Sequence, residues 1–156
     1  MVELDVLLGL TDGAERPVES SAPAGLRRLA SSKRIVKPWG EERWLVPEGS
    51  PFGFKAILVR AGARTSLQYH EVKEEANLVL RGRGRLTFAS TTEAARTEHE
   101  LAPGDIVHVA PGEVHRIEAL SDLVLLEVST PELDDVIRIE DDAARGNGRI
   151  PQEHRG

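Results

Sequence analysis

Short runs in which apolar and polar residues alternate fill the middle of the chain, and turn-forming residues separate them. In TSLQYH, for example, this alternation puts Ser66, Gln68 and His70 on one face of an extended strand. The runs are FGFKAILVRAG (52–62), TSLQYH (65–70), EANLVLRG (75–82), RLTFAS (85–90), ELAPGDIVHVAPGEVHRIEA (100–119) and SDLVLLEVSTP (121–131). Short strands with turn signals at roughly ten-residue intervals are typical of a sandwich or a barrel, so the pattern predicts an all-β fold.

The 156 residues suffice for one such core but not for two. We predict an N-terminal arm or linker at 1–32, where Ser, Ala, Pro and Gly accumulate, a barrel domain at 33–145 and a flexible C-terminal tail at 146–156. Within the barrel, the turn residues at 81–84 predict a hairpin, and the segment 131–146 predicts a short helix at its end.

The composition argues against some classes of function and limits the possible metal ligands. The formal net charge of -6 argues against a broad surface for nucleic acid or for an anionic membrane, and the RGRGR stretch at 81–85 is interpreted as a turn with solvated arginines. No long apolar run and no signal-peptide pattern are present, so we expect a cytoplasmic protein. Because the chain contains no cysteine, any metal must be held by imidazole, carboxylate or amide oxygen.

Two stretches combine glycines with side chains that can bind a metal: the first has Gly62, Gln68, His70, Glu75 and Gly82, and the second has Gly104, Pro111, Gly112 and His115. Their spacing resembles that of the two cupin motifs. The resemblance implies a double-stranded β-helix, the cupin jelly-roll barrel, with Gln68, His70, Glu75 and His115 as ligands of one divalent metal. Two imidazoles, one carboxylate and one amide oxygen suit Zn, Mn, Fe, Co or Ni better than Ca or Mg.

Residues 34–145 resemble, more narrowly, the C-terminal cupin domain of type II mannose-6-phosphate isomerases. The residues that carry this resemblance are KPWGEE near Lys37, FKAILVRAGARTSLQYH, EVHRIE around His115 and DDVIRIEDD. The resemblance implies a sugar-phosphate substrate and an aldose–ketose isomerisation, in which the metal stabilises an enediolate during proton transfer.

The residues that we expect to act on that substrate are Lys55, Arg116 and Lys73. Lys55 matches a family lysine, Arg116 matches the family's His-Arg pair and is a candidate for phosphate, and Lys73 replaces a family arginine. Asn77 replaces a family tryptophan, so the substrate and the reaction stay open.

Two other functions remain as alternatives. A small-molecule cupin enzyme such as a non-haem iron oxygenase could use the same ligands, and so could a metal- or sugar-binding cupin without turnover. Arg85 is a candidate for the pocket, and the direction of His108 is left open. Sheet edges and the apolar residues between Leu4 and Leu8 favour a homodimer.

Overall fold

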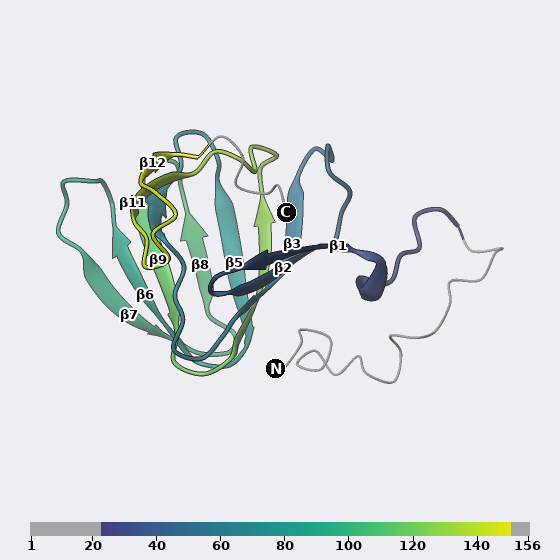
Figure 1. Ribbon diagram of the computed structural model, residues 1–156, viewed down its shortest axis with the longest axis horizontal. Helices are drawn as coiled ribbons and strands as arrows, with labels where there is room; N and C mark the ends of the chain where they lie inside the picture. Colours follow the sequence, from purple (N-terminus) through teal and green to yellow (C-terminus); the bar gives the residue numbers. More distant parts are fainter. Residues whose placement is uncertain (1–22, 151–156) are drawn as a thin grey trace.

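The computed structural model describes residues 23–150, which form twelve β-strands and one turn of 3₁₀-helix (Figure 1). These elements are η1 (Leu29–Ser31), β1 (Lys33–Lys37), β2 (Gly40–Trp44), β3 (Gly53–Val59), β4 (Leu67–Tyr69), β5 (Glu75–Arg81), β6 (Gly84–Ala89), β7 (Thr97–Leu101), β8 (Ile106–Val109), β9 (Val114–Ala119), β10 (Leu123–Ser129), β11 (Ile137–Glu140) and β12 (Gly148–Arg149). The apolar residues between Leu4 and Leu8, on which the predicted dimer partly rests, lie outside the described range.

The strands form two antiparallel sheets. One has the order β1-β2-β3-β10-β5-β8 and the other the order β12-β11-β4-β9-β6-β7. From β3 to β11 the chain crosses between the sheets at almost every connection, so each sheet consists of strands that are distant in sequence. This topology confirms the predicted jelly-roll barrel, in which two facing sheets share one core.

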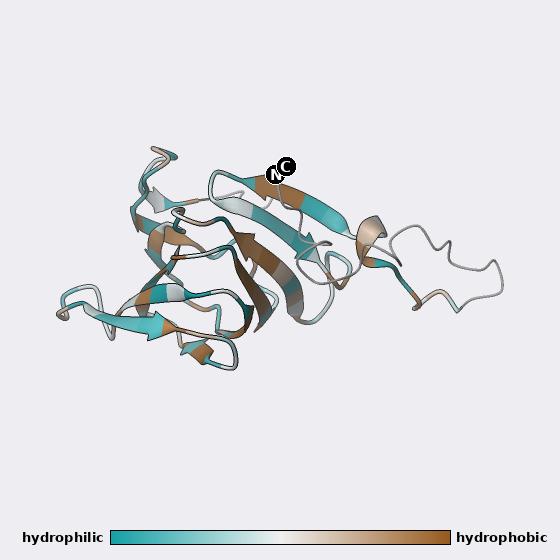
Figure 2. Ribbon diagram, turned by 90° about the horizontal axis from the view of Figure 1, so that it is seen from below, coloured by the Kyte–Doolittle hydropathy of each residue, from teal (hydrophilic) through white to brown (hydrophobic). Residues whose placement is uncertain are grey.

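The side chains that point between the sheets are apolar at one end of the barrel and polar at the other. The apolar members include Ile57, Val59, Val79, Ile117, Ala119, Leu123 and Leu125, and the polar members include Lys55, Glu75, Asn77, His115, Glu127 and Ser129. Figure 2 shows brown, hydrophobic stretches giving way to teal, hydrophilic ones along several strands. Because burial of the apolar side chains stabilises the closed end, the same strands can hold charged groups at the open end.

The predicted hairpin at 81–84 is wrong. Strand β5 pairs with β8 and β10, whereas β6 pairs with β7 and β9, so the turn between them joins the two sheets. Gly82 has φ +87°, and a Cβ at this position would lie 2.1 Å from the backbone oxygen of Asp122. Residues 81–84 do form a turn, but this turn connects a strand of one sheet to a strand of the other.

The C-terminal part of the barrel also differs from the prediction. Residues 137–140 form strand β11, where Ile137 and Arg138 pair with Tyr69 and Gln68 of β4, and no helix forms in the segment 131–146. Strand β12 lies inside the predicted tail, and its Arg149 forms ion pairs with Glu71 and, at 3.6 Å, with Asp135. These contacts attach residues 148–149 to the barrel.

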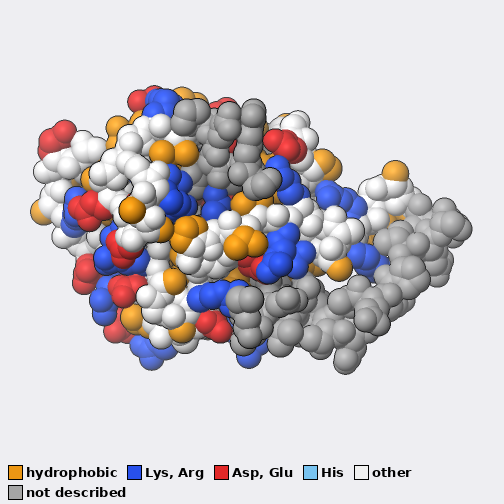
Figure 3. All heavy atoms as spheres, viewed as in Figure 1, with side chains coloured by type: hydrophobic (Ala, Val, Ile, Leu, Met, Phe, Trp, Pro, Cys, Tyr) orange, Lys and Arg blue, Asp and Glu red, His pale blue; other side chains and the backbone are white. Residues whose placement is uncertain are grey.

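The surface carries both signs of charge. Figure 3 shows lysine and arginine side chains interspersed with aspartate and glutamate over the described part of one face. Arg83 pairs with Glu100, and Arg96 pairs with Glu140, each at 2.8 Å. Within residues 23–150, no helix has the length and apolar character needed to cross a membrane.

Candidate metal centre

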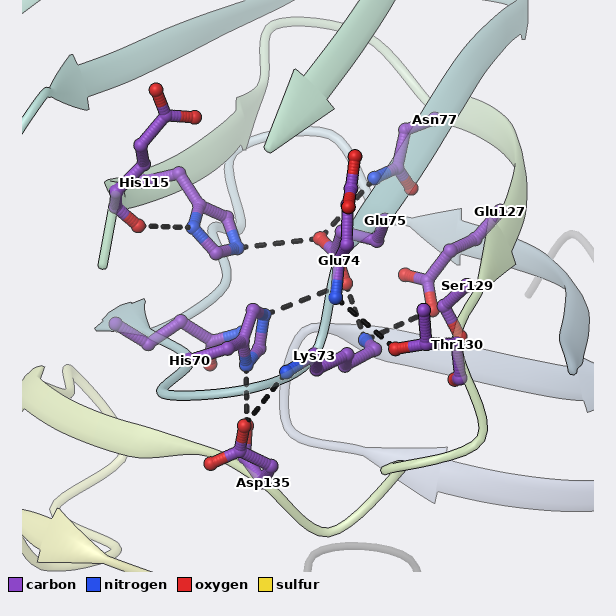
Figure 4. A network of polar contacts seen from close by, with 12 residues as sticks. His70, Lys73, Glu74, Glu75, Asn77, His115, Glu127, Ser129, Thr130 and Asp135 are labelled. Carbon is purple, nitrogen blue, oxygen red and sulfur yellow. Dashed lines mark hydrogen bonds and ion pairs between the residues drawn. The ribbon is translucent and has the colours of Figure 1, made fainter. Parts of the chain in front are cut away.

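His70, Glu75 and His115 converge at the polar end of the barrel (Figure 4). His70 Nε2 lies 3.5 Å from Glu75 Oε2, and His115 Nε2 lies 3.3 Å from Glu75 Oε1. One potential ligand atom from each of the three side chains falls within 4.8 Å of the others, and all three side chains are buried. Donors this close together can bind a single ion.

Both sheets contribute to this cluster. Glu75 begins β5 in one sheet, while His115 lies on β9 and His70 directly follows β4 in the other sheet. Gln68 on β4 is the cross-strand partner of His115 and lines the same cavity, where its Oε1 accepts a hydrogen bond of 2.7 Å from Ser66. The four predicted ligands are thus brought to one end of the barrel, and coordination by Gln68 stays a prediction.

The hydrogen bonds of the two histidines leave their Nε2 atoms for a metal. His70 Nδ1 lies 2.5 Å from the carbonyl oxygen of Asp135, and His115 Nδ1 lies 3.3 Å from that of Glu113. Because a carbonyl oxygen only accepts, these contacts assign a proton to each Nδ1 and leave each Nε2 as the atom that faces Glu75. His70 Nε2 is buried without a hydrogen-bond partner among the described residues. A buried orphan nitrogen next to a carboxylate fits a divalent ion of the Zn, Mn, Fe, Co or Ni class.

Asp135 holds the loop between His70 and Glu75. Its Oδ2 accepts hydrogen bonds from the backbone N–H groups of Val72, at 2.6 Å, and Lys73, at 2.9 Å, while its carbonyl fixes the ring of His70. Burial by itself raises the pKa of Asp135, but these backbone N–H groups outweigh that effect and hold the pKa below its usual value. Asp135 therefore orients a ligand without being one.

A chain of alternating charges extends from the cluster along the inside of the barrel. Lys73 Nζ binds Glu75 Oε2 and lies 3.2 Å from Glu127 Oε1, and Lys55 Nζ lies 3.9 Å from the same oxygen and 3.3 Å from Glu42 Oε2. Burial lowers the pKa of Lys73, but the charges of Glu127 and Glu75 prevail and raise it above its usual value. Burial likewise raises the pKa of Glu75, yet the Lys73 ammonium and the two histidines hold it well below its usual value. The polar end of the barrel is thus a network in which buried lysines alternate with buried carboxylates.

The three predicted catalytic residues do not lie together. Lys55 and Lys73 line the cavity above the cluster, but Arg116 does not. Alternation along β9 directs His115 and Ile117 inward, so Arg116 points out of the barrel. Its guanidinium donates to the carbonyl oxygens of Thr65, at 2.9 Å, and Glu140, at 3.1 Å, which ties β9 to neighbouring segments. The structure therefore gives Arg116 a structural position.

Two further side chains that the sequence left open also lie outside the cavity. Arg85 is partly exposed and lies 3.5 Å from Glu118, and His108 is exposed on β8, with Nε2 2.6 Å from Glu74 Oε1. Sequence interpretation missed Glu42, Glu127 and Asp135. A signal existed for Glu127, because alternation along LVLLEVS places this charge on the inward face with Leu123 and Leu125.

The cavity above the cluster is small. Its volume is about 70 Å³, and its walls include Trp39, Ser66, Gln68, Asn77 and Val136 besides the charged residues. Sites for drug-sized ligands measure about 300–1,000 Å³. A ligand that reaches the cluster is therefore small, or it places only its reacting end inside the barrel.

Comparisons with known proteins agree with this fold. Residues 57–129 match the family model described as a cupin domain. The structure is similar to the capsular polysaccharide assembling protein CapF from Staphylococcus aureus, with TM-score 0.61, 19% identity and coverage of 70% of this chain and 32% of CapF. It is also similar to oxalate decarboxylase from Bacillus subtilis at pH 4.6, with TM-score 0.61, 17% identity and coverage of 71% and 31%.

A third similar structure is the formate complex of oxalate decarboxylase from Lactobacillus farciminis, with TM-score 0.58, 16% identity and coverage of 69% of this chain and 33% of that protein. The chain thus matches about one third of the length of these proteins. A search of curated proteins found no match. Likeness at this level of identity shows the fold alone: residues 57–129 match a cupin-domain model, and the polar end of the barrel holds a cluster capable of binding a metal.

Proposed function

We propose that this protein is a metal-dependent isomerase that interconverts the aldose and ketose forms of a small sugar, with sugar phosphates such as mannose 6-phosphate as the first substrates to test. The observation that carries the proposal is the His70–Glu75–His115 cluster, of which Glu75 and His115 line the same cavity as Lys55. Such a reaction needs a Lewis acid and a proton-transferring group at one place, and both fit here.

His70, Glu75 and His115 would hold the metal, with Gln68 as the fourth ligand. A bound divalent ion supplies a positive charge that polarises a substrate carbonyl and stabilises negative charge on neighbouring oxygens. Its charge of 2+ exceeds the single negative charge of Glu75, so an oxygen-rich ligand is favoured over an apolar one.

The chain's own contribution begins with Lys55. Its ammonium is buried and lies beside Glu42 and Glu127, which fix the direction of its N–H bonds. From the cavity wall it can donate a proton to a substrate oxygen. Lys73 binds the ligand Glu75 itself, so we assign it the task of orienting that carboxylate.

The phosphate of a sugar phosphate is the part of the proposal that the geometry supports least. Arg116, the residue expected to bind it, points out of the barrel and donates to Thr65 and Glu140. Both lysines of the cavity are already paired with carboxylates. Assays therefore need unphosphorylated sugars beside the phosphorylated ones.

The first experiment measures metal content by mass spectrometry on protein purified without chelator. Wild type should carry about one metal ion per chain, and the double variant His70→Ala, His115→Ala should carry none. His108→Ala is the matched control, because this exposed histidine lies outside the cavity and should leave metal content unchanged.

The second experiment follows sugars by NMR with the metal-loaded protein. Mannose 6-phosphate, fructose 6-phosphate and their unphosphorylated forms are incubated with and without a chelator. Metal-dependent interconversion supports the proposal. Fe(II)-dependent oxygen consumption without interconversion would overturn it in favour of an oxygenase, and binding without turnover would overturn it in favour of a binding module. A cytoplasmic location and a homodimer remain part of the proposal, with size-exclusion chromatography coupled to light scattering as the test of the dimer.

A further inference from the structure

Glu127 is a buried carboxylate on the wall of the cavity, beside Lys55 and Lys73. It lies on the inward face of β10, in register with Lys55 on β3 and Asn77 on β5, and it lines the same cavity as Glu75 and His115. Its neighbours on this face of β10 toward the closed end, Leu123 and Leu125, belong to the apolar core. A charge in this position costs desolvation free energy, and that cost suggests a function.

The two oxygens of Glu127 have different surroundings. Lys73 donates to Oε1 at 3.2 Å, and Lys55 lies 3.9 Å from the same atom. Both of these contacts fall on Oε1 and neither falls on Oε2. One oxygen is therefore anchored by two ammonium groups, and the other is left as an acceptor beside the cavity, which is the arrangement of an oriented base.

We propose that Glu127 is the general base of the isomerisation and that Lys55 is its acid partner; this rests on the proposed function. In the aldose-to-ketose direction, Glu127 takes the proton from C2, the C2–H electron pair forms the C1–C2 double bond, and the C1 oxygen takes a proton from Lys55. The hydroxyl proton on O2 then returns to Lys55, the C2 carbonyl forms, and C1 takes the proton held by Glu127. Both side chains end in their starting protonation states, so the step requires no further reactant.

Glu42 differs from Glu127 although both carboxylates border Lys55 in the cavity. Glu42 Oε2 lies 3.3 Å from Lys55 Nζ and accepts a hydrogen bond of 3.4 Å from the indole N–H of Trp44. It also lies on β2, two strands away from β10 in the sheet, while Glu127 is linked through Lys73 to Glu75. Glu42 is thus the matched control, with the same chemistry and burial but a different position.

The test compares wild type with Glu127→Gln, Glu127→Asp and Glu42→Gln. Glutamine keeps the shape of Glu127, and its carbonyl oxygen can face the lysines, which leaves an amide NH₂ where the free oxygen lay. Incorporation of deuterium from D₂O into the sugar should fall by about 10²–10⁴-fold in Glu127→Gln, because that is the usual contribution of a general base. Aspartate should restore part of the loss, and Glu42→Gln, which removes one of the two carboxylates beside Lys55, should lower the incorporation by less than Glu127→Gln does. Metal content should stay at about one ion per chain in every variant.

Calorimetric binding of arabinonohydroxamate gives a second readout that is independent of turnover. Its N–H mimics the carbon that exchanges a proton, so Glu127→Gln should weaken its binding by about tenfold, which corresponds to one lost hydrogen bond. Deuterium incorporation in Glu127→Gln within tenfold of wild type, or an equal loss in Glu42→Gln, overturns the proposal.

The same variants separate this proposal from the proposed function. If wild type exchanges no sugar proton, the isomerase proposal fails, and hydroxamate binding then decides the assignment of Glu127. Equal affinity in wild type and Glu127→Gln overturns it, and weaker binding in the variant supports Oε2 as the atom that faces the ligand. If Glu127→Gln loses metal, Glu127→Asp replaces it in both comparisons.

Discussion

Replacement of Asp135 by alanine should weaken metal binding although the four predicted ligands stay in place. Its side chain accepts the backbone N–H groups of Val72 and Lys73, which lie in the loop between the ligands His70 and Glu75. Without these hydrogen bonds the loop samples other conformations, and metal binding must then order it.

The size of the effect follows from the two hydrogen bonds. A hydrogen bond to a charged acceptor stabilises by about 1.5–3 kcal/mol, and the low end applies here because the Val72 amide is exposed. Two bonds amount to roughly 3 kcal/mol, of which only the part that depends on metal appears as affinity. Since 1.4 kcal/mol corresponds to tenfold, we expect a 10- to 100-fold loss, the range found for residues that support metal ligands.

The assay is a titration of metal-free protein with Zn²⁺ or Mn²⁺ in competition with a chromogenic chelator. Asp135→Asn is the control, because its amide oxygen can still accept both N–H groups and should keep affinity within about fivefold. Urea unfolding of the metal-free proteins separates loss of the loop from loss of the fold. A folded Asp135→Ala variant with wild-type metal affinity would refute the idea that this side chain supports the ligands.

Three further changes test the fold and the site. Gly82→Ala should destabilise the protein in urea by more than Gly62→Ala. Both glycines have positive φ, but of the two only Gly82 would place the new Cβ against a backbone oxygen. Equal losses of about 1–2 kcal/mol would mean that backbone strain alone accounts for the effect. Arg116→Met should lower urea stability while metal content and turnover stay within about threefold, and a selective loss of turnover would restore Arg116 to the catalytic set. The hydrogen bond from Arg145 lowers the pKa of Asp141. The contribution of Asp141 to stability is therefore present above about pH 4 and is lost as pH falls through its lower folded-state pKa. Arg145→Gln should flatten this part of the plot of unfolding free energy against pH, and an unchanged plot would contradict the role of Arg145.

The sequence was sufficient for most of the strands, because alternation is a local property, whereas the convergence of His70, Glu75 and His115 was predicted from the resemblance to the two cupin motifs. Gln68, Glu75 and His115 each occupy an inward position that period-two alternation assigns directly, and the spacing of the two motifs joins them. The same alternation argues against Arg116, the immediate neighbour of His115. The family resemblance predicts that Arg116 contacts the substrate, whereas the geometry of the strand predicts an outward side chain, and the structure agrees with the strand.

Pairing between distant strands could not be predicted. The turn at 81–84 carries ordinary hairpin residues, yet only the partners of β5 and β6 decide that it connects two sheets. The contacts of Glu127 could not be predicted for the same reason, because its proximity to Lys55 and Lys73 depends on the registers of β10 with β3 and β5. Contacts of this kind arise from the closed barrel, so no local pattern contains them.

His115 lies on β9 and His70 directly follows β4 in one sheet, whereas Glu75 lies on β5 in the other, so neither sheet alone supplies all three ligands. An ion bound there links the two sheets, and this link can form only after the barrel has closed. Opening of the gap between the sheets then requires release of the ion, so amide hydrogen exchange in β4, β5 and β9 should slow together on loading, in proportion to metal affinity. The metal centre therefore also holds the two sheets together, and the stability of the polar end of the barrel depends on bound metal.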